Sequence, residues 1–457
     1  MIRELHISGF RGFGKEQQIS FAIPDGKTIG SGLSIITGAN NSGKTTIIEA
    51  IQAFNYANDN TPSFSEGRRN SLTDGKVSLR IVDESNETYT IESAPSGGSS
   101  TIKNKAFTLQ YYVLQSRRSV PFEFSKSTWD KDLFISHSQM LDNQRSSSLK
   151  HFEARIFQIE KQKDEFDLIL SKVLGNDFSW TIEQRDSGQY YIKYSTNGIS
   201  HSSEGVGDGI WSIFTICAAL FDSKSNETIV VDEPELSVHP RLQKKLMEIF
   251  LEYSTTRQII ISTHSPYFIN WNVITNNANL IRVTKDNQNS VCFSISENCR
   301  KQFKGILNDI NNPHTLGLDA NEVFFLDDGI ILVEGQEDVV ILDRISKELE
   351  IKIEGTFFGW GVGGAPKMEA FLYLFKDLGY KRVVVILDGD KSNEAEMLSK
   401  KFSENNYKFI TLVEDDIRDK KDRSIKGKVG ITFENGKLKD KYIEYAQKLI
   451  MDINSAL

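Results

Sequence analysis

The sequence has few cysteines, no long hydrophobic run and no excess of positive charge. It contains three cysteines, Cys217, Cys292 and Cys299, in 457 residues. Their odd number and their lack of metal-binding spacing predict reduced thiols and argue against a disulfide framework. The most apolar stretch, residues 210–221, is too short to span a bilayer. No apolar core follows basic residues near the N-terminus, so we expect no signal peptide. These absences predict a cytoplasmic protein that has no membrane partner.

The charge balance excludes a protein that is basic over its whole surface. Lysine and arginine number 54, aspartate and glutamate number 62, and the formal net charge is −8. Any surface that binds nucleic acid must therefore be a local basic patch. The hydrophobic fraction of 39% and the charged fraction of 25% are typical of globular proteins. The length allows two or three domains.

The clearest motif of the chain lies at residues 38–45, which fit the pattern G-x-x-x-x-G-K-[ST]. A short buried strand is predicted before it, at residues 33–37, and an amphipathic helix after it. In this context the glycines allow backbone N–H groups and a helix N-terminus to converge on phosphate oxygens. Lys44 would reach the β- and γ-phosphates, and Thr45 would offer its hydroxyl to Mg²⁺. The alternative is a chance match in an ordinary strand–turn–helix unit. The predicted nucleotide ligands of this loop are Gly38, Asn40, Asn41, Ser42, Gly43, Lys44, Thr45 and Thr46.

A second motif follows a hydrophobic strand at residues 228–232. This strand ends in Asp232 and Glu233. Asp232 would hold the metal's water, and Glu233 would polarise the attacking water in ATP hydrolysis. His264 comes after the next buried strand and could sense the γ-phosphate by hydrogen bonding; a structural role for this lone histidine is the alternative.

A Gly- and Ser-rich loop at residues 203–209 precedes the apolar helix. Ser203 and Gly205 could present a hydroxyl and N–H groups to a phosphate. Such loops also cap many ordinary helices, so this signal gains weight mainly from its place before the Asp-Glu motif.

The segment between these motifs carries a helical insertion at about residues 126–176. Apolar residues recur at helical spacing over Lys150–Leu174, which predicts one helix. We interpret the insertion as an arm or dimerisation helix, and a plain core helix is the alternative. Before it, residues 2–10 look like an edge strand, and Gly97–Ser100 mark a loop or hairpin tip.

Taken together, these motifs and the opening Leu5–Arg11 resemble the ABC-type ATPase heads of RecF, SMC and the OLD family over roughly residues 1–300. The resemblance implies that ATP is sandwiched between two protomers, with the signature loop acting in trans, and hence a homodimer or higher homo-oligomer. The signature loop lacks the usual leading Leu and the full Gly-Gly pair. No clear Q-loop is visible, although Gln110 or Gln115 could serve.

A new α/β pattern begins at residue 329. One apolar strand ends in Glu334, with Asp338 four residues further, and a second strand ends in Asp388 with Asp390 close behind. The carboxyl ends of parallel strands meet at one edge of a sheet. Four carboxylates could not sit there together without a cation, and such hard ligands suit Mg²⁺ or Mn²⁺. Two ions would clamp the attacking and leaving oxygens of a phosphodiester. Acidic turn residues at strand ends are the alternative.

This pattern resembles a Toprim domain, and an ABC-type head followed by Toprim is similar to the OLD family of ATP-dependent nucleases. The resemblance implies that Glu334 and Asp338 hold one ion while Asp388 and Asp390 hold the other. It also implies a later acidic group, sought in residues 414–416, and a lysine that supports the scissile phosphate. Four lysines compete for that role: Lys420, Lys421, Lys426 and Lys428.

The sequence thus predicts an α/β protein with two functional domains. An ABC-type P-loop ATPase domain (residues 1–300) with an inserted helical arm is joined by residues 301–328 to a Toprim domain (329–457) with a Rossmann-like parallel sheet. The leading hypothesis is an ATPase and an ATP-regulated, divalent-metal-dependent DNA endonuclease or nickase, with ATP and Mg²⁺ or Mn²⁺ as cofactors. The alternative is an SMC- or RecF-like ATP-dependent DNA clamp whose Toprim domain is a non-catalytic scaffold.

The resemblance to the OLD family also implies a biological role in anti-phage defence. Such proteins often act beside a helicase, or beside a retron reverse transcriptase and its nucleic acid. DNA and a second copy of this chain are therefore the expected partners.

Overall fold

The chain forms two compact units, residues 1–292 and residues 293–457. The computed structural model describes residues 1–55, 62–64, 66–71, 73, 75–94, 101–105, 109, 111–141, 149–196, 198–202, 207–307, 316–326, 329–421 and 427–457. The predicted loop tip at residues 97–100 lies outside them.

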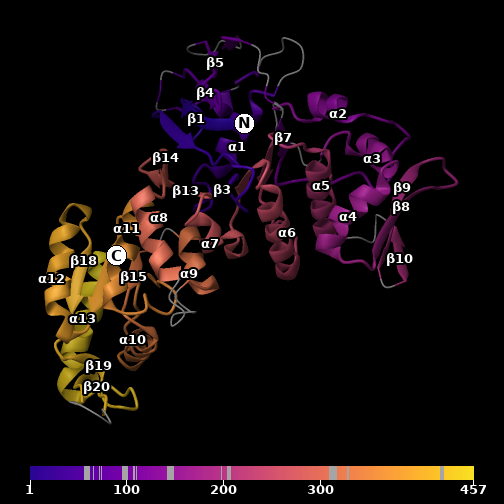
Figure 1. Ribbon diagram of the computed structural model, residues 1–457. Helices are drawn as coiled ribbons and strands as arrows, with labels where there is room; N and C mark the ends of the chain where they lie inside the picture. Colours follow the sequence, from indigo (N-terminus) through magenta and orange to yellow (C-terminus); the bar gives the residue numbers. More distant parts are fainter. Residues whose placement is uncertain are drawn as a thin grey trace. The chain divides into compact units, whose positions relative to one another are not determined.

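A mostly parallel six-stranded sheet forms the centre of the first unit (Figure 1). Its order is β14 (Asn289–Ser294), β13 (Asn279–Asp286), β3 (Leu33–Thr37), β12 (Gln258–Ser262), β11 (Thr228–Asp232) and β7 (Tyr111–Leu114). The strands β13, β3, β12, β11 and β7 pair in parallel. Every residue of β3, β11 and β12 is buried, because helices and neighbouring structure cover both faces, which explains their continuous apolar sequences.

An antiparallel sheet forms the second layer of this unit. Its order is β2 (Gln17–Ser20), β1 (Ile2–Ser8), β4 (Ser78–Asp83), β5 (Thr88–Ser93) and β6 (Thr101–Lys103). The expectation of an edge strand at residues 2–10 is therefore wrong, because β1 pairs with β2 on one side and β4 on the other. The helix α1 (Lys44–Gln52) joins the layers, since its Ile47 lies in one buried cluster with Leu5 of β1 and Ile260 of β12.

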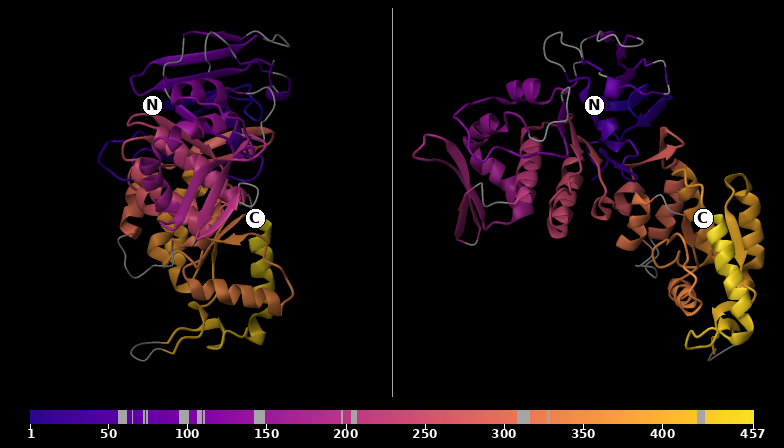
Figure 2. Two further views of the ribbon diagram at one scale, coloured as in Figure 1. Left: turned by 90° about the vertical axis from the view of Figure 1, so that its right-hand side faces the viewer. Right: turned by 180° about the vertical axis from the view of Figure 1, so that it is seen from behind.

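Between β7 and the apolar helix α5 (Asp208–Asp222), the described residues form three helices and a small antiparallel sheet. These are α2 (Lys131–Ser138), α3 (Phe152–Glu160) and α4 (Lys163–Leu174), followed by β8 (Phe178–Gln184), β9 (Tyr190–Thr196) and β10 (Ile199–Ser202). The single helix expected over residues 150–174 is broken at residues 161–162. Phe166 of α4 contacts both Trp180 of β8 and Phe214 of α5, so α4 packs between them (Figures 1 and 2).

Among the described residues, the first unit also contains the helices α6 (Pro240–Tyr253) and α7 (Trp271–Ile274) and the short 3₁₀ helices η1 (Glu66–Arg68) and η3 (Pro266–Phe268). Proline at the first position of α6 fits the helix start, because that residue needs no amide hydrogen for the helix.

The second unit contains a four-stranded parallel sheet. Its order is β16 (Thr356–Phe357), β15 (Ile330–Leu332), β17 (Val383–Leu387) and β18 (Lys408–Thr411). A separate two-stranded sheet joins β19 (Asp416–Arg418) to β20 (Gly430–Thr432). The helices are α8 (Glu297–Leu307), α9 (Leu318–Glu322), α10 (Gln336–Glu348), α11 (Ala365–Asp377), α12 (Ser392–Lys401) and α13 (Ile443–Ala456). Short 3₁₀ helices span Val323–Phe325, Gly389–Lys391, Ser403–Asn405 and Asp440–Tyr442.

Two apolar groups hold this second unit together. Residues of α10 and α13 share one buried cluster with β15 and β17, including Ile345, Ile450 and Val384. Phe371 of α11 instead packs against Phe303 of α8 and against Phe358, which follows β16. These contacts pack the helices against the sheet. The segments that follow the carboxyl ends of β15 and β17 carry Glu334 and Asp388. Across the described residues, no helix combines the length and the apolar character that a membrane span requires.

Candidate active sites

The first candidate site begins with the loop between β3 and α1. Gly43 has a φ of 123°, and a Cβ there would lie 2.7 Å from Ser290 Oγ, so only glycine fits. The hydroxyl of Ser290 donates to the Ser42 carbonyl at 2.6 Å and fixes the loop. Lys44 is 5% exposed, and its Nζ donates to the carbonyls of Gly38 (2.9 Å) and Ala39 (2.8 Å). The loop thus folds around the lysine as a phosphate-binding loop does.

Three parallel strands deliver other predicted groups to the same edge. Residues Asp232, His264 and Gln115 follow or end strands β11, β12 and β7, which lie next to one another and next to β3. Because carboxyl ends of parallel strands share one edge, Asp232 and His264 emerge beside the loop of Lys44. Asp232 is 1% exposed and sits in register with Ser262. His264 lies near enough to Lys44 for the lysine charge to act on the imidazole.

His264 is a neutral imidazole at neutral pH. Burial, and then the nearby Lys44, lower the pKa of His264 to about 4. Its backbone N–H donates to the Glu235 carboxylate at 2.5 Å, and the Thr263 hydroxyl donates to the same carboxylate at 2.9 Å. Burial also raises the pKa of Glu235. The imidazole is therefore held by its backbone and can donate or accept a hydrogen bond without carrying charge.

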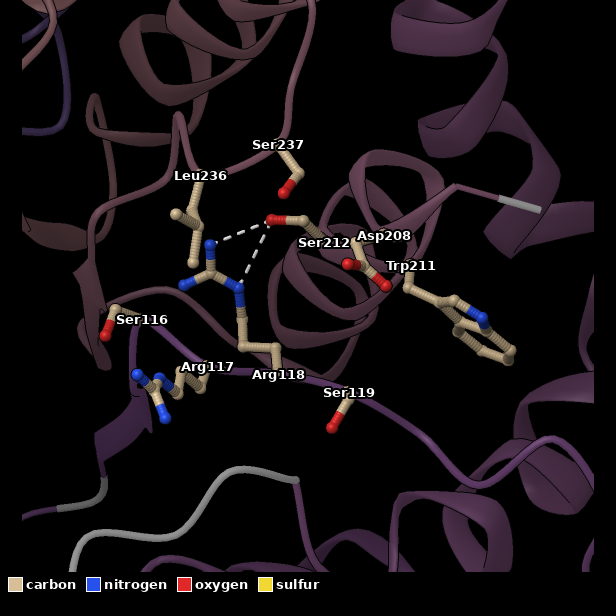
Figure 3. Close-up of a pocket in the computed structure, with 9 residues that line it drawn as sticks. All are labelled: Ser116, Arg117, Arg118, Ser119, Asp208, Trp211, Ser212, Leu236 and Ser237. Carbon is tan, nitrogen blue, oxygen red and sulfur yellow. Dashed lines mark hydrogen bonds between the residues drawn. The ribbon is translucent and has the colours of Figure 1, made fainter. Parts of the chain in front are cut away.

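Arg118 is a functional candidate that the sequence motifs did not identify. Its guanidinium is buried, and it donates to the carbonyls of Asp232 (2.7 Å) and Glu233 (2.8 Å). It also donates to the hydroxyl of Ser212 on α5 at 2.8 Å, as Figure 3 shows. Glu233 has a φ of 48°, an uncommon backbone conformation for a non-glycine residue. Arg118 thus ties the backbone of both acidic residues to the first turns of α5.

A cavity of about 300 Å³ lies around this arginine. It is lined by Ser116, Arg117, Arg118, Ser119, Asp208, Trp211, Ser212, Leu236 and Ser237 (Figure 3). Ser203 and Gly205, the predicted signature-loop ligands before α5, lie outside the described residues, and so does Gln110. Gln115 is described, and its Nε2 donates to Gln52 Oε1 at 2.9 Å.

The second candidate site lies where β15 and β17 end. The Asp388 N–H donates to Glu334 Oε1 at 3.0 Å, which links the ends of the two strands. The N–H groups of Gly363 and Gly364 donate to the Glu334 carbonyl at 3.0 and 2.8 Å. A Cβ at Gly389 would lie 2.2 Å from the Glu414 carbonyl, so glycine is required directly behind Asp388. These contacts fix the backbone at Glu334 and Asp388, and therefore the positions from which their carboxylates project.

Asp388 lies in a cluster of acidic groups. Burial raises its pKa to about 8, and the charges of Asp338, Asp416 and Glu334 add to the increase. Burial likewise raises the pKa of Asp338 to about 6, against the hydrogen bond that its Oδ2 accepts from the Gly335 N–H at 2.8 Å. Glu334 and Asp338 thus lie near enough to Asp388 for their charges to act on its carboxylate.

Asp416 joins this cluster and was not predicted as an individual ligand. It is 1% exposed, whereas the carboxylate of Glu414 contacts the Tyr442 hydroxyl and Asp415 is exposed. The acidic run at residues 414–416 was the available signal. The pairing of β19 shows that Asp416, the last residue of this run, is the buried one.

Two of the candidate lysines reach the acidic cluster. Lys428 Nζ lies 2.8 Å from Asp390 Oδ2 and 3.7 Å from Asp416 Oδ2. Lys420 Nζ lies 2.6 Å from Asp416 Oδ2 and 3.2 Å from Glu337. Lys421 instead pairs with Glu434 at 3.1 Å, and Lys426 lies outside the described residues.

The donor chemistry of the cluster fits a hard divalent cation, because carboxylate oxygens are the ligands that Mg²⁺ and Mn²⁺ prefer. Burial, and then the like charges of Asp338, Asp416 and Glu334, raise the pKa of Asp388, and a bound cation would oppose both effects. Within the part of the chain that the structure describes, however, no three His, Cys, Asp or Glu side chains are already arranged to hold an ion together. The ammonium groups of Lys420 and Lys428 pair with Asp416 and Asp390 and so offset part of the negative charge of the site.

Comparison with curated proteins finds relatives over parts of the chain. The OLD nuclease of Thermus scotoductus is 26% identical over 264 residues, which is 54% of this chain and 48% of that protein. Endonuclease GajA of Bacillus cereus is 25% identical over 49% of this chain and 36% of its own length. The Old nuclease of Escherichia phage P2 is 30% identical over 28% of this chain and 21% of its own length. The chain thus spans about half, or less, of the length of these relatives.

Solved structures that resemble this chain include SMC heads. The SmcHead bound to the C-winged helix domain of ScpA has 18% identity and a TM-score of 0.45, and covers 65% of this chain and 98% of its own. The SMC head domain from Thermotoga maritima has 16% identity and a TM-score of 0.35, and covers 65% of this chain and 99% of its own.

Two family models match the two parts of the chain. Residues 33–270 match the model described as "AAA domain, putative AbiEii toxin, Type IV TA system". Residues 325–390 match "Overcoming lysogenization defect protein-like, TOPRIM domain". The first match contains Lys44, Asp232 and His264, and the second contains Glu334 and Asp388. Because the first match covers more than half of the chain, the protein belongs to this AAA-domain family, and it carries an OLD-like Toprim domain behind its ATPase domain.

Proposed function

We propose that this protein is an ATP-regulated, divalent-metal-dependent DNA endonuclease or nickase. The observation that carries the proposal is the environment of Asp388. Its backbone N–H donates to the Glu334 carboxylate, and burial, together with the charges of Asp338 and Asp416, raises its pKa to about 8. A strongly perturbed carboxylate among like charges at the edge of a parallel sheet is typical of a catalytic centre. The names of the relatives, which are nucleases and an endonuclease, support the same activity.

The proposed metal ligands are Glu334, Asp338, Asp388 and Asp390, and we add Asp416 to them. Bound Mg²⁺ or Mn²⁺ would stabilise the attacking and leaving oxygens of the phosphodiester. The protein's own part is to hold these carboxylates at the ends of β15 and β17, at the start of α10 and at the start of β19. Lys428 and Lys420 stand beside them, and each can exchange its carboxylate partner for a phosphate oxygen of the substrate. We therefore assign the late phosphate-supporting lysine to Lys428 first and Lys420 second.

In the ATPase domain, the proposed nucleotide ligands are the loop residues 38–46 and, from a second protomer, Ser203 and Gly205. ATP would supply the binding energy that closes two domains on each other. Lys44 would bind its phosphates, Thr45 and Asp232 the Mg²⁺, and Glu233 would orient the attacking water. His264, which is neutral, would donate a hydrogen bond to the γ-phosphate.

Several parts of the proposal concern the whole assembly. We propose a homodimer or higher homo-oligomer formed through the ATPase domain (residues 1–300), with the helical insertion at 126–176 as a contact arm. Residues 301–328 would connect it to the nuclease domain at 329–457. DNA is the proposed substrate, and anti-phage defence, beside a helicase or a retron partner, is the proposed role.

A plasmid cleavage assay tests the activity. Wild-type protein with Mg²⁺ or Mn²⁺, with and without ATP, is compared with Glu334→Ala. We expect metal-dependent nicking or cutting that the substitution abolishes, while ATP hydrolysis persists. Cleavage by Glu334→Ala at the wild-type rate would contradict the proposed site.

One observation favours a second function, an ATP-dependent DNA clamp with a non-catalytic Toprim scaffold. No three acidic, His or Cys groups among the described residues are pre-arranged around an ion, and two of the acidic residues, Asp390 and Asp416, already pair with Lys428 and Lys420. ATP-dependent retention on circular DNA without any cleavage, under every metal condition, would support the clamp over the nuclease.

A further inference from the structure

A groove of about 910 Å³ runs beside the acidic cluster of the second unit. It is lined by Asp419, Lys420, Lys421, Gly427, Lys428, Val429, Phe433, Glu434 and Asn435. Its size is at the upper end of the range of ligand pockets, large enough for more than one nucleotide. Its lining combines lysines with exposed apolar groups, since Val429 is 45% and Phe433 48% exposed.

Phe433 is a fixed aromatic surface in this groove. Its N–H donates to the Lys437 carbonyl at 2.9 Å, and its carbonyl accepts from Gly436 at 2.8 Å, so the residue opens a tight turn. Lys439 Nζ lies 5.7 Å from the centre of the ring. That ammonium is itself held by Asp419 Oδ1 and the Gly430 carbonyl, both at 2.7 Å. The ring is therefore backed by a fixed cation while much of its surface faces solvent.

The charges of the groove favour an anionic ligand. The Lys421 side chain is 88% exposed. The two acidic residues in the lining already have basic partners, because Asp419 pairs with Lys439 and Glu434 lies 3.1 Å from Lys421. The three lysines of the lining outnumber its two acidic residues, so a phosphate backbone in the groove would meet an excess of ammonium groups while Asp419 keeps its partner Lys439.

The groove is continuous with the acidic cluster through Lys420 and Lys428. The backbones of these lysines form a reciprocal pair of hydrogen bonds, both of 3.0 Å, so their side chains stand opposite each other. Both belong to the groove lining, and both also contact Asp416. A strand in the groove would thus lead directly to the carboxylates proposed to cleave it.

We propose that this groove binds a single-stranded segment of the DNA substrate, with one unpaired base stacked on Phe433 and adjacent phosphates on Lys421 and Lys428. Bases within a duplex already stack on their neighbours, so an exposed aromatic ring of this kind selects unpaired bases. The inference rests on the proposed nuclease function and adds the substrate form: single-stranded DNA, or duplex that is open at the cleavage position.

The test measures binding rather than cleavage. Fluorescence anisotropy of labelled oligonucleotides in EDTA compares a single strand with the duplex of the same sequence. The variants are Phe433→Leu, Phe433→Tyr and, as a matched control, Met451→Ala, an exposed apolar residue on α13 that does not line the groove. Stacking on one base corresponds to roughly a 5- to 150-fold change in affinity.

We expect Phe433→Leu to weaken single-strand binding about tenfold and duplex binding less than about twofold. Phe433→Tyr keeps the ring, so it should bind the single strand nearly as wild type does, and Met451→Ala should not differ from wild type. Lys421→Gln should reduce the salt dependence of single-strand binding by about one counter-ion.

Three outcomes would overturn the inference: wild-type single-strand affinity in Phe433→Leu, an equal loss for single strand and duplex, or no binding of single strands by the wild-type protein. None of these depends on cleavage. Failure of the proposed nuclease would show separately, as unchanged cleavage in Glu334→Ala or as its absence in the wild type.

Discussion

Arg118 donates a 2.7 Å hydrogen bond from Nη1 to the backbone carbonyl of Asp232, the acidic residue that ends β11. The same guanidinium binds the Glu233 carbonyl and the Ser212 hydroxyl. Burial lowers the pKa of Arg118 to about 10, so the group stays charged at neutral pH and each of these bonds is charge-assisted. A single side chain therefore connects the proposed catalytic carboxylates to the helix that follows the signature loop.

We expect Arg118→Lys to slow ATP hydrolysis at least tenfold while nucleotide affinity changes little. Lysine cannot reproduce the planar fork that binds several acceptors at once, so the Glu233 backbone loses its support. The measurement is kcat for ATP, together with nucleotide binding by calorimetry. Arg117→Lys is the control, since Arg117 is the exposed neighbour in the same segment. Equal kcat values for the two variants would refute this positioning role.

Ser212→Ala tests the hydrogen bond of Arg118 to α5 separately from its bonds to the acidic backbone. It removes the acceptor on α5 and leaves the bonds to Asp232 and Glu233 in place. We expect a smaller loss of kcat than in Arg118→Lys, because the acidic backbone stays anchored. A thermal unfolding curve checks that both variants are folded. If Ser212→Ala were the more damaging variant, α5 rather than the acidic backbone would be the important partner.

Substitutions at Lys44 and Glu233 should affect different steps, ATP binding and ATP hydrolysis respectively. Lys44→Ala removes the ammonium that the loop holds, so ATP binding should be lost. Glu233→Gln keeps the shape of the side chain but cannot accept a proton, so ATP should bind while turnover falls by about 10²-fold or more. Equilibrium binding and single-turnover hydrolysis distinguish these outcomes. Unchanged hydrolysis in Glu233→Gln would remove it as the catalytic carboxylate.

Local sequence carried enough information to place most of the candidate sites. The loop of Lys44 and the ends of the strands before Asp232, Glu334 and Asp388 are each encoded within about ten consecutive residues. Parallel strands then bring such ends to one edge without further instruction. For this reason the ends of β15 and β17 lie side by side, and the Asp388 N–H reaches the Glu334 carboxylate.

Features that depend on distant partners could not be predicted in this way. Strand β1 looked like an edge strand, yet it pairs with β4, more than 70 residues further along the chain. Arg118 acquires its role only when β7 lies beside β11 and α5. The inward position of Asp416 follows from the pairing of β19 with β20, because a shift by one residue would present Asp415 instead.

The raised pKa of Asp388 predicts how the free energy of unfolding depends on pH when no metal is bound. The native pKa of Asp388, about 8, exceeds its usual 3.8, so the native state binds more protons than the unfolded state between these values. The free energy of unfolding should fall as pH rises through that window. Asp388→Asn should remove this penalty and stabilise the protein in EDTA at pH 8 by roughly 1–2 kcal/mol, after allowance for solvent screening.

Asp390→Asn is the matched control for this experiment. Asp390 lies 2.8 Å from Lys428. Loss of its charge therefore removes an attractive ion pair and should not stabilise the protein. Chemical denaturation in EDTA and in Mg²⁺ measures both variants. Mg²⁺ should stabilise the wild type more than Asp388→Asn. An unchanged response to Mg²⁺ in Asp388→Asn would argue against Asp388 as a ligand.

His264 predicts a pH dependence of the opposite sign. Its native pKa of about 4 lies below the usual 6.5, so between these values the native state binds fewer protons than the unfolded state. The free energy of unfolding should therefore fall as pH is lowered from 6.5 to 4, and the contribution should be absent above 6.5. His264→Gln keeps a hydrogen-bonding side chain and does not titrate. Urea unfolding at pH 7 and pH 5 should show a smaller acid-induced loss in this variant than in the wild type, whereas identical losses would mean that His264 is not held neutral beside Lys44.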